Sequence, residues 1–344
     1  MGRPSISVVI PTFNRGATIV AAVASALRQS RPANEVVVVD DGSTDGTVEI
    51  LGCASIGADP RLRVIRLRHG ERSRARNAGI SQTSGELLAF LDSDDLWRED
   101  HLETQCRALE HSPAAVAAVG DYGLVDEQGR LIRKHVRRTT ENGGLGIRGF
   151  DLGNDDDVRR ALVLKRIIIH PSEVVARRDV VVASGCFRDT VNGAEDWVLW
   201  VHLALQGRLL LTGRQTVWLR RSSDNTFSRP QEFADSIVRA AEMVVSTGLP
   251  EAVGAPGDLV RAVADVHASI ALAHGGERGI AVELLRRAIL RAPRIMLDRR
   301  FWLAPRRIVL GGRVAARVRR LRWKPGNTVA AARQCKVQQA SERR

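Results

Sequence analysis

The sequence predicts an α/β fold in which a mostly parallel central sheet is flanked by helices and followed by a helical C-terminal extension. In about the first 110 residues, short apolar runs of strand length alternate with stretches whose apolar residues recur at helical spacing. Most residues of these strand runs are apolar, which is typical of parallel strands covered on both faces. With 344 residues, 44% of them hydrophobic and 26% charged, the chain can build such a core.

The N-terminal half is predicted to contain four strands, each followed by a helix. The strands cover residues 7–10, 35–40, 62–67 and 87–91. The helices cover residues 16–30, 44–51, 73–82 and 98–110. In a sheet of this type, ligands bind beyond the carboxyl ends of the strands. The polar residues that follow each strand are therefore the first place to look for a site.

The rest of the chain is less regular. We expect a strand at 116–125, a polar, Gly-rich mobile loop at 135–160, a strand at 174–183, a helix at 196–205 and a strand at 208–218. Residues 231–289 have a helical pattern with a break near Pro250 and Pro256. The chain is therefore predicted to divide into a sheet-containing domain at 1–228, a helical extension at 229–290 and a basic tail at 291–344.

The cysteines and the apolar runs bear on the compartment. The four cysteines are widely spaced and form no Cys-x-x-Cys pair, which argues against a structural zinc site and against a disulfide scaffold. The apolar run at 6–10 is too short for a secretory signal, and no stretch of about 18 apolar residues could span a bilayer. These features predict a cytoplasmic protein with reduced thiols.

The formal net charge of +13 is concentrated at the C-terminal end. Residues 286–344 contain 18 Lys and Arg and two acids, a net charge of +16, which leaves −3 for the rest. Apolar residues such as Trp302 and Val309 are interleaved with these arginines, which suits peripheral contact with an anionic membrane on its cytoplasmic face. A solvated, unstructured tail is an equally compatible interpretation. A nucleic-acid-binding tail is a weaker one, because no recognition motif accompanies it.

Three acidic clusters follow predicted strands or open a predicted helix: Asp40-Asp41, Asp92-Ser93-Asp94-Asp95 and Glu195-Asp196. Each alone is compatible with a solvated turn that caps a helix. Asp92 and Asp94 differ, because residues two apart in an extended segment point to the same side and can face one hard cation. Mg²⁺ or Mn²⁺ is usually held by one or two carboxylates while a ligand's phosphates complete the shell. This segment is therefore a candidate metal site.

Five motifs in this order resemble those of family 2 glycosyltransferases. They lie at residues 7–15, 40–45, 75–80, 92–95 and 195–197. The resemblance implies a GT-A-type fold, a catalytic domain at 1–228, a nucleotide-diphospho-sugar donor and inversion at the anomeric carbon. The Gln-x-x-Arg-Trp motif of processive members is absent, because Arg319 stands at the Gln position before Arg322-Trp323. Transfer of one sugar per encounter is therefore predicted.

The resemblance also implies roles for individual residues. On the donor side it implies Pro11, Thr12, Asn14, Asp41, Arg74, Arg76, Asp92 and Ser93. On the acceptor side it implies Glu195, Trp197 and His170. Thr12 and Asp41 would contact the nucleotide base, and Arg74 and Arg76 would lie near the nucleotide or the acidic segment. Asp94, together with Asp92, would hold Mn²⁺ or Mg²⁺, whereas Asp95 is compatible with a simple helix-side cap.

Asp196 would be the catalytic base, and Trp197 would offer a face on which a sugar can stack. A carboxylate can take the proton of the attacking hydroxyl, while a divalent cation stabilises the charge that develops on the leaving diphosphate. The other interpretation of this pair is a helix-capping Asp beside a core Trp.

These assignments predict transfer of a sugar to a saccharide or lipid-linked acceptor, as in polysaccharide or cell-envelope glycan synthesis. The alternative is a catalytically silent carbohydrate- or nucleotide-binding protein of the same fold. The presence of both Asp94 and Asp196 argues against that alternative. A nucleic-acid-binding protein is favoured only by the tail and is opposed by the near-neutral remainder of the chain.

Overall fold

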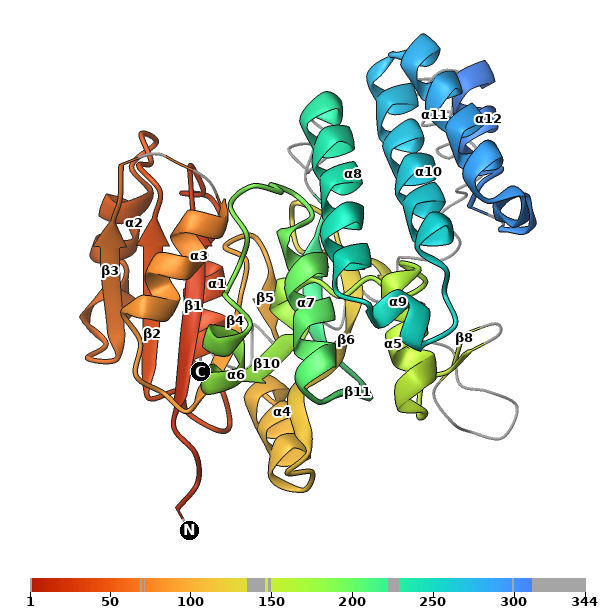
Figure 1. Cartoon of the computed structure of the whole chain (residues 1–344). Helices are drawn as coiled ribbons and strands as arrows, with labels where there is room; N and C mark the ends of the chain where they lie inside the picture. Colours follow the sequence, from red (N-terminus) through yellow and green to blue (C-terminus); the bar gives the residue numbers. More distant parts are fainter. Residues whose placement is uncertain are drawn as a thin grey trace, which may run out of the picture.

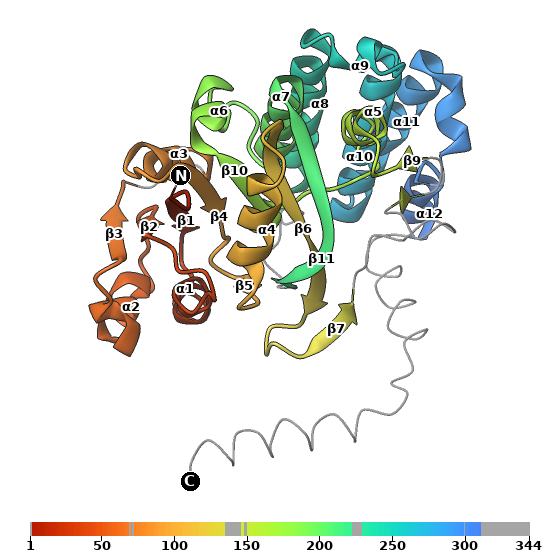
Figure 2. The ribbon, with the colours of Figure 1, turned by 90° about the horizontal axis from the view of Figure 1, so that it is seen from below.

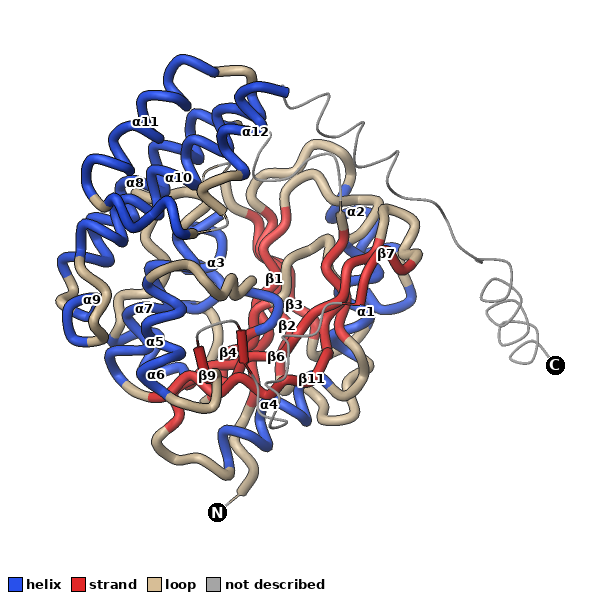
Figure 3. The backbone as a smooth tube through the Cα atoms, turned by 90° about the vertical axis from the view of Figure 1, so that its right-hand side faces the viewer, coloured by secondary structure: helices blue, strands red, loops and turns tan. Residues whose placement is uncertain are grey.

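The computed structural model describes residues 2–68, 70, 72–134, 146–147, 150–221, 229–298 and 300–310. The predicted α/β class is confirmed, because the strands form a sheet that carries helices on its faces (Figure 1). Figure 3 shows the strands lying together, with the helices of the C-terminal part gathered on one side of them.

The N-terminal half alternates between strands and helices. The strands are β1 (Ile6–Thr12), β2 (Glu35–Asp40), β3 (Leu62–Arg66) and β4 (Leu87–Phe90). The helices are α1 (Ile19–Leu27), α2 (Thr47–Cys53), α3 (Arg72–Ser81) and α4 (His101–Glu110), with the 3-10 turn η1 (Ser55–Ala58) after α2 and the short strand β5 (Leu96–Trp97) before α4. All eight predicted elements are present, which confirms the reading of their apolar periodicity.

The second half of the domain adds further strands and helices. The strands are β6 (Ala115–Val125), β7 (Leu131–Lys134), β8 (Gly146–Ile147), β9 (Phe150–Asp151), β10 (Val174–Arg177) and β11 (Arg208–Arg220). The helices are α5 (Asp155–Val163), α6 (Arg178–Ala183) and α7 (Glu195–Gln206), and the 3-10 turn η2 (Pro171–Glu173) precedes β10.

Two predictions for this region are wrong. The strand predicted at 174–183 stops at Arg177 and continues as α6, in which Val181 is buried but Val182 is exposed, so the apolar run is not one buried strand. The loop predicted at 135–160 already contains β9 and α5. That helix begins there because the side chain of Asn154 accepts hydrogen bonds from the first-turn N–H groups of Asp156 and Asp157. Residues 135–145 and 148–149 of the predicted loop lie outside the described residues.

The strand order places the ends of three strands at one edge of the sheet. Within the described residues the order is β3-β2-β1-β4-β10-β6-β11-β5, with β7 paired to β6 and a separate β8-β9 pair. The run β3-β2-β1-β4 is parallel, as is the β6-β11 pair, whereas β10 lies antiparallel between β4 and β6. The carboxyl ends of β1, β2 and β4 therefore meet at the same edge, where a ligand site is expected.

Alternate side chains of the parallel strands point to two separate cores. Val8 and Ile10 of β1 pack in a core with Ile19 and Val23 of α1. Val9, between them, belongs to the core on the opposite face, which includes α5, α7 and the C-terminal helices. Both faces are thus apolar, which explains why β1 reads as a continuous apolar run.

The helical extension packs beside the sheet domain. It consists of α8 (Pro230–Ser246), α9 (Leu249–Ala252), α10 (Gly257–Gly275), α11 (Arg278–Arg291), the 3-10 turn η4 (Pro293–Leu297) and α12 (Leu303–Leu310). Helix α10 contacts α8, α11 and α12. Figures 1 and 2 both show α10, α11 and α12 at the edge of the molecule opposite to α2 and β3.

The predicted start of the tail at residue 291 is too early. Ile295, Phe301 and Ala304 are buried, so helical packing continues through α12. Residues 311–344 of the predicted tail lie outside the described part of the chain. Among the described helices, none is both long enough and apolar enough to cross a membrane.

Candidate active site

The loops after β1 and β2 are tied together at the carboxyl edge of the sheet. The N–H of Asp41 donates to the carbonyl of Thr12 at 2.8 Å. The N–H of Asn14 donates to the hydroxyl of Ser43, and the amide oxygen of Asn14 accepts from the N–H of Thr44, both at 2.8 Å. Asn14 adopts the left-handed conformation with φ 50°, which asparagine tolerates better than most residues. Asn14 therefore joins the two loops.

Asp41 organises the next part of the rim. Its carboxylate accepts from the N–H of Gly70 at 2.9 and 3.1 Å, just before α3 begins. An open hollow of about 370 Å³ lies there, lined by Gly70, Arg74, Asp189 and Thr190. Arg74 is exposed at this hollow. Arg74, predicted on the donor side, thus lines this hollow, and Asp41, also predicted there, binds the Gly70 that lines it.

Three further residues predicted on the donor side, Pro11, Thr12 and Ser93, lie at the same edge of the sheet. Pro11 is half-buried in β1, opposite Val39 of β2. The hydroxyl of Thr12 is buried and makes no hydrogen bond with any described residue. Ser93 is buried in the turn that Asp92 to Asp95 form after β4. The unpartnered hydroxyl of Thr12 is a polar group whose burial is unfavourable unless a ligand or water pairs with it.

The acidic turn, Asp92 to Asp95, is fixed from below by Asp95. Its carboxylate accepts from the hydroxyl of Ser172 at 2.6 Å and from the N–H of Arg220 at 3.0 Å. Ser172 also accepts from the N–H of Asp92 at 3.0 Å, and the Arg220 side chain donates to the carbonyl of Asp94 at 3.0 Å. Asp95 is thus buried and holds the turn on η2 and β11; the helix-side cap predicted for it is wrong, because α4 begins only at His101.

Arg76 connects the acidic turn to the start of α7. Its guanidinium donates to Asp92 at 2.7 Å and to Glu195 at 2.8 Å, and it lies over the ring of Phe187 with 5.2 Å to the centroid. Arg76 is 3% exposed. Of the two places predicted for Arg76, the structure has it at the acidic segment. Direct contact with a nucleotide is excluded by its burial.

The carboxylates of the turn differ in their electrostatic surroundings. Burial would raise the pKa of Asp92, but the charge and hydrogen bond of Arg76 outweigh burial and lower it. Burial and the charge of Asp92 raise the pKa of Asp94, against which Arg15, 3.7 Å away, acts in the opposite direction. Burial and the charges of Asp94 and Asp92 raise the pKa of Asp95 well above its usual range. Burial and mutual repulsion therefore disfavour the ionised forms of Asp94 and Asp95, and a bound cation would favour them.

This donor set fits a hard divalent cation. Asp92 and Asp94 keep 30% and 26% of their side-chain surface exposed, so both can reach a ligand. Among the described residues, no group of three or more His, Cys, Asp or Glu could hold a metal alone. Two partly exposed carboxylates suit Mg²⁺ or Mn²⁺ whose remaining ligands come from a diphosphate and water.

Two further predicted residues, Asp196 and His170, lie near the start of α7 that Arg76 binds through Glu195. Asp196 is half-buried in the first turn of α7 and accepts from the N–H of Trp197 at 2.7 Å. Burial and the charge of Glu195 raise the pKa of Asp196, while Lys165 and Arg76 act against them. His170 pairs with Glu173 at 2.8 Å. Burial would lower the pKa of His170, but Glu173 outweighs it, and the charges of Asp196 and Asp92 add to the rise.

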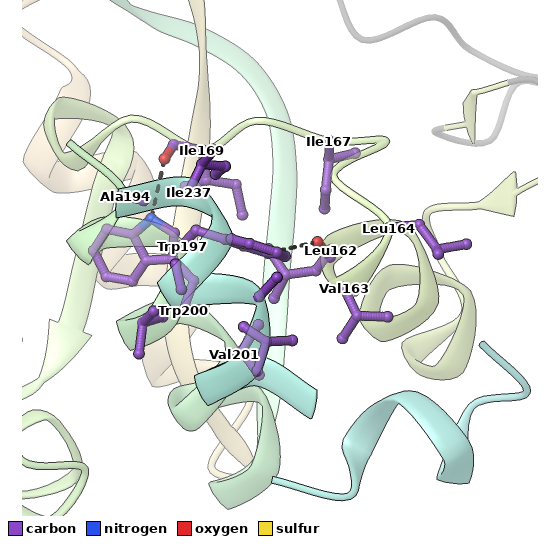
Figure 4. Close-up of a cluster of buried hydrophobic side chains, with 14 of the residues drawn as sticks. Leu162, Val163, Leu164, Ile167, Ile169, Ala194, Trp197, Trp200, Val201 and Ile237 are labelled. Atoms are coloured by element: carbon purple, nitrogen blue, oxygen red, sulfur yellow. Dashed lines mark hydrogen bonds between the residues drawn. The ribbon is translucent and has the colours of Figure 1, made fainter. Parts of the chain in front are cut away.

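Two residues predicted on the acceptor side are instead structural. Trp197 is 3% exposed, and its indole N–H donates to the carbonyl of Leu162 at 2.9 Å within the core between α5 and α7 (Figure 4). Its ring is covered by the ammonium group of Lys165, 4.4 Å from the centroid. Glu195 is 4% exposed and is bound by Arg76 and by the N–H of Gly193. Neither side chain can meet a sugar, so the prediction of sugar stacking on Trp197 is wrong.

Sequence reasoning did not find several residues that shape this site. Ser172 and Arg220 fix the acidic turn, and Ser172 lies two residues after the predicted His170 in the chain. Lys165 lies over the ring of Trp197 at the start of α7. No motif marks Lys165 or Arg220, because their roles depend on which distant segments meet in the fold.

The chain matches a known family and known structures. Residues 7–164 match the family model described as glycosyl transferase family 2. The succinoglycan biosynthesis protein ExoO of Rhizobium meliloti is 41% identical over 133 residues, which cover 38% of this chain and 36% of ExoO. The chain spans about a third to two thirds of the length of the curated relatives that it matches.

Two solved structures share the architecture. S. aureus TarS 1-349 in complex with UDP-GlcNAc aligns with a TM-score of 0.61 at 20% identity, covering 94% of this chain and 93% of TarS. The mannosyltransferase PcManGT from Pyrobaculum calidifontis, in complex with GDP-Man and Mn²⁺, aligns with a TM-score of 0.55 at 18% identity, covering 90% and 87%. At these identities the likeness concerns the fold alone, and it confirms the predicted GT-A-type fold. Five motifs in order and the match to the family model over residues 7–164 support membership of glycosyl transferase family 2.

Proposed function

We propose that the chain is a metal-dependent, inverting glycosyltransferase that moves one sugar from a nucleotide-diphospho-sugar to a saccharide or lipid-linked acceptor hydroxyl. The observation that carries this proposal is the pair of ion pairs made by Arg76, because they bring the acidic turn and the start of α7 together at the carboxyl edge of the sheet. The match to the family model supports the reaction class. The nucleotide sugars bound by TarS and PcManGT support the donor class.

Asp196 would act as the base. It would accept the proton of the acceptor hydroxyl while the hydroxyl oxygen attacks the anomeric carbon opposite to the departing diphosphate, which inverts the configuration in one step. Its position in the first turn of α7 opposes, through the helix dipole, the rise in pKa that burial and Glu195 cause. His170, coupled electrostatically to Asp196 and Asp92, would contact the acceptor between them.

The donor would lie along the rim built by β1, β2 and α3. Asp41 and Thr12 would bind the nucleotide base, and Arg74 would bind at the adjacent hollow. Asp94 and Asp92 would hold Mn²⁺ or Mg²⁺, which supplies positive charge to the leaving diphosphate when bound. The Mn²⁺ in PcManGT supports this assignment.

Asp94→Asn tests the proposed metal site. Asn keeps the size of the side chain but removes one of the two anionic ligands, so we expect Mn²⁺ to bind roughly 10- to 100-fold more weakly in the presence of the donor. Isothermal calorimetry with UDP- and GDP-sugars measures this. The true donor, at about 100 times its Kd, is expected to raise the free energy of unfolding of the wild type by roughly 2.7 kcal/mol. Thermal denaturation with the same sugars measures this.

Asp179→Asn is the matched control, because Asp179 is an exposed carboxylate in the first turn of α6, and its N–H contact is the same as that of Asp196. The metal site is assigned wrongly if Asp94→Asn and Asp179→Asn bind Mn²⁺ equally well. Donor turnover that is unaffected by a chelator in the wild type would contradict metal dependence.

We further propose that the end of the extension contacts an anionic membrane, which places the enzyme at the cytoplasmic face and suits a lipid-linked acceptor. Exposed apolar side chains accumulate on η4, on α12 and in the turn between them: Met296, Leu297, Trp302, Leu303 and Val309. Exposed Arg294 and Arg306 lie among them. Sedimentation with vesicles that contain anionic lipid is expected to carry the protein down at low salt and to lose it at high salt. Equal binding to neutral vesicles, or none to either kind, would contradict the proposal.

A further inference from the structure

Lys165 ends helix α5 in a backbone conformation that usually requires glycine. Its φ is 48°. Its N–H donates to the carbonyl of Leu162 at 2.9 Å, and the N–H of Arg166 donates to the carbonyl of Ala161 at 2.7 Å. This is the hydrogen-bond pattern of a Schellman helix end, in which the left-handed position is most often Gly because a side chain is strained there. A lysine at this position is strain retained in the fold, and such strain concentrates at functional sites.

The helical extension fixes this loop through Arg300. The Arg300 guanidinium donates to the carbonyl of Leu164 at 3.0 Å and to the carbonyl of Lys165. Asp298 holds the guanidinium at 2.9 Å and also pairs with Arg166 at 3.0 Å. Residues on both sides of the strained position are thus bound by the extension. The C-terminal helices therefore determine where Lys165 lies.

The ammonium group of Lys165 is held beside the start of α7. It lies over the ring of Trp197, 4.4 Å from the centroid. The indole N–H of that ring donates to the carbonyl of Leu162, which holds the ring in place (Figure 4). Asp196 precedes Trp197 and accepts from its N–H. Trp197 thus serves as a platform that keeps a positive charge next to the proposed base.

We propose that Lys165 is a positioning residue for Asp196: its ammonium group, seated on Trp197 by a loop that Arg300 fixes, keeps the carboxylate ionised and aimed at the acceptor. This inference rests on the proposed function, in which Asp196 is the base. It gives the helical extension a direct part in catalysis, and it explains why a strained lysine stands where glycine would be easier.

The other charges around Asp196 leave this task to Lys165. Glu195 on the same helix raises the pKa of Asp196, as burial does. Arg76 from α3 opposes them less than Lys165 does and is already paired with Asp92 and Glu195. His170, before η2, is bound to Glu173. Burial lowers the pKa of Lys165 itself to about 8, which leaves most of its ammonium charged at neutral pH.

Lys165→Met and Lys165→Arg separate charge from packing. Both keep a long side chain over Trp197, but only Arg keeps the positive charge. For Lys165→Met we expect the acid limb of the kcat/KM profile to move up by about one pH unit, because the carboxylate loses its cation. At pH 6 to 7 kcat is then expected to fall, while the KM of the donor does not change. Lys165→Arg is expected to retain the wild-type limb.

Two variants guard the interpretation. Arg160→Met removes an exposed positive charge from the same helix and is expected to leave the profile unchanged. Lys165→Gly relieves the left-handed backbone, so it is expected to melt no lower than Lys165→Met while it shows the same shifted limb. If Lys165→Met misfolds, Lys165→Gly gives the same measurement on a relaxed loop.

The outcomes distinguish the two proposals. An acid limb that stays in place in both Lys165→Met and Lys165→Gly, in an enzyme that Asp196→Asn inactivates, overturns the role of Lys165 alone. An Asp196→Asn variant with full activity overturns the proposed function, in which Asp196 is the base, and with it the role of Lys165. An acid limb that moves equally in Lys165→Arg shows that packing, not charge, is responsible, and this too overturns the proposal.

Discussion

Asp196→Asn is expected to lower kcat by about 10²- to 10⁴-fold, the range that general-base catalysis contributes. Asn has nearly the same shape and can still accept the hydrogen bond from the N–H of Trp197, but it cannot take a proton from the acceptor hydroxyl. Because Arg76 separates Asp196 from the acidic turn, where the proposed metal and diphosphate would bind, the Kd of the donor should change little. Steady-state transfer assays, together with donor titration by calorimetry, measure both quantities.

Asp179→Asn again supplies the control. Asp179, in the first turn of α6, makes the same contact to the following N–H, at 2.8 Å, yet it is exposed, and α6 follows the end of β10 that pairs with the start of β4, opposite to the acidic turn after β4. Transfer by this variant is expected to match the wild type. If Asp196→Asn transfers sugar at the wild-type rate, another group is the base, and His170 would be the next to test.

The parts of the fold that the sequence predicts are those whose pattern is local. Strand β2 is one example, because Val36 to Val39 are buried on both faces and so form an unbroken apolar run. Strand β10 was only half predictable, since its place between β4 and β6 depends on antiparallel pairing with segments far away in the chain. The division of residues 174–183 into β10 and α6 follows from that pairing, which the apolar run does not encode.

The candidate site likewise has features that a motif predicts and features that depend on distant segments of the chain. Motif order and strand position predict that Asp41 and Asp92 meet at one edge of the sheet, which is where they lie. The motif containing Glu195 and Trp197 marks the start of α7 but not its burial. The resemblance therefore suggests acceptor contacts for two side chains that the core and Arg76 occupy. The hold of Arg300 on Lys165 joins segments 135 residues apart, and no spacing rule reveals it.

Arg76→Met is expected to lower the free energy of unfolding by about 3 kcal/mol at neutral pH. Breaking a buried ion pair by removing one partner costs roughly 3–5 kcal/mol, and the lower end applies because Asp92 keeps 30% of its side-chain surface exposed. Met can still pack on Phe187, so the loss reports the uncompensated carboxylates. Urea denaturation of the two proteins at pH 7 measures the difference.

The difference between the two proteins should depend on pH. In the wild type the pKa of Asp92 is lowered, so its stabilising contribution is present above pH of about 4 and is lost as the pH falls through the folded-state value. Without Arg76, burial remains and raises the pKa of Asp92. Protonation therefore removes the unpaired buried charge of the variant at a higher pH than in the wild type. The gap in unfolding free energy is therefore expected to be widest near neutral pH and to narrow as the pH falls towards 4. A gap that stays constant would mean that packing causes the loss.

Arg31→Met separates stability from catalysis in this prediction. Arg31 is 5% exposed and pairs at 2.6 Å with Glu110, the last residue of α4, so it is a buried arginine of similar kind outside the candidate site. Its loss is expected to destabilise the protein comparably but to leave kcat unchanged at a temperature where both variants are folded. Arg76→Met is expected to lose transfer activity under the same conditions, because Arg76 sets the distance between the acidic turn and the start of α7. Equal activity of the two variants would mean that Arg76 only stabilises the fold and that the turn and Asp196 keep their places without it.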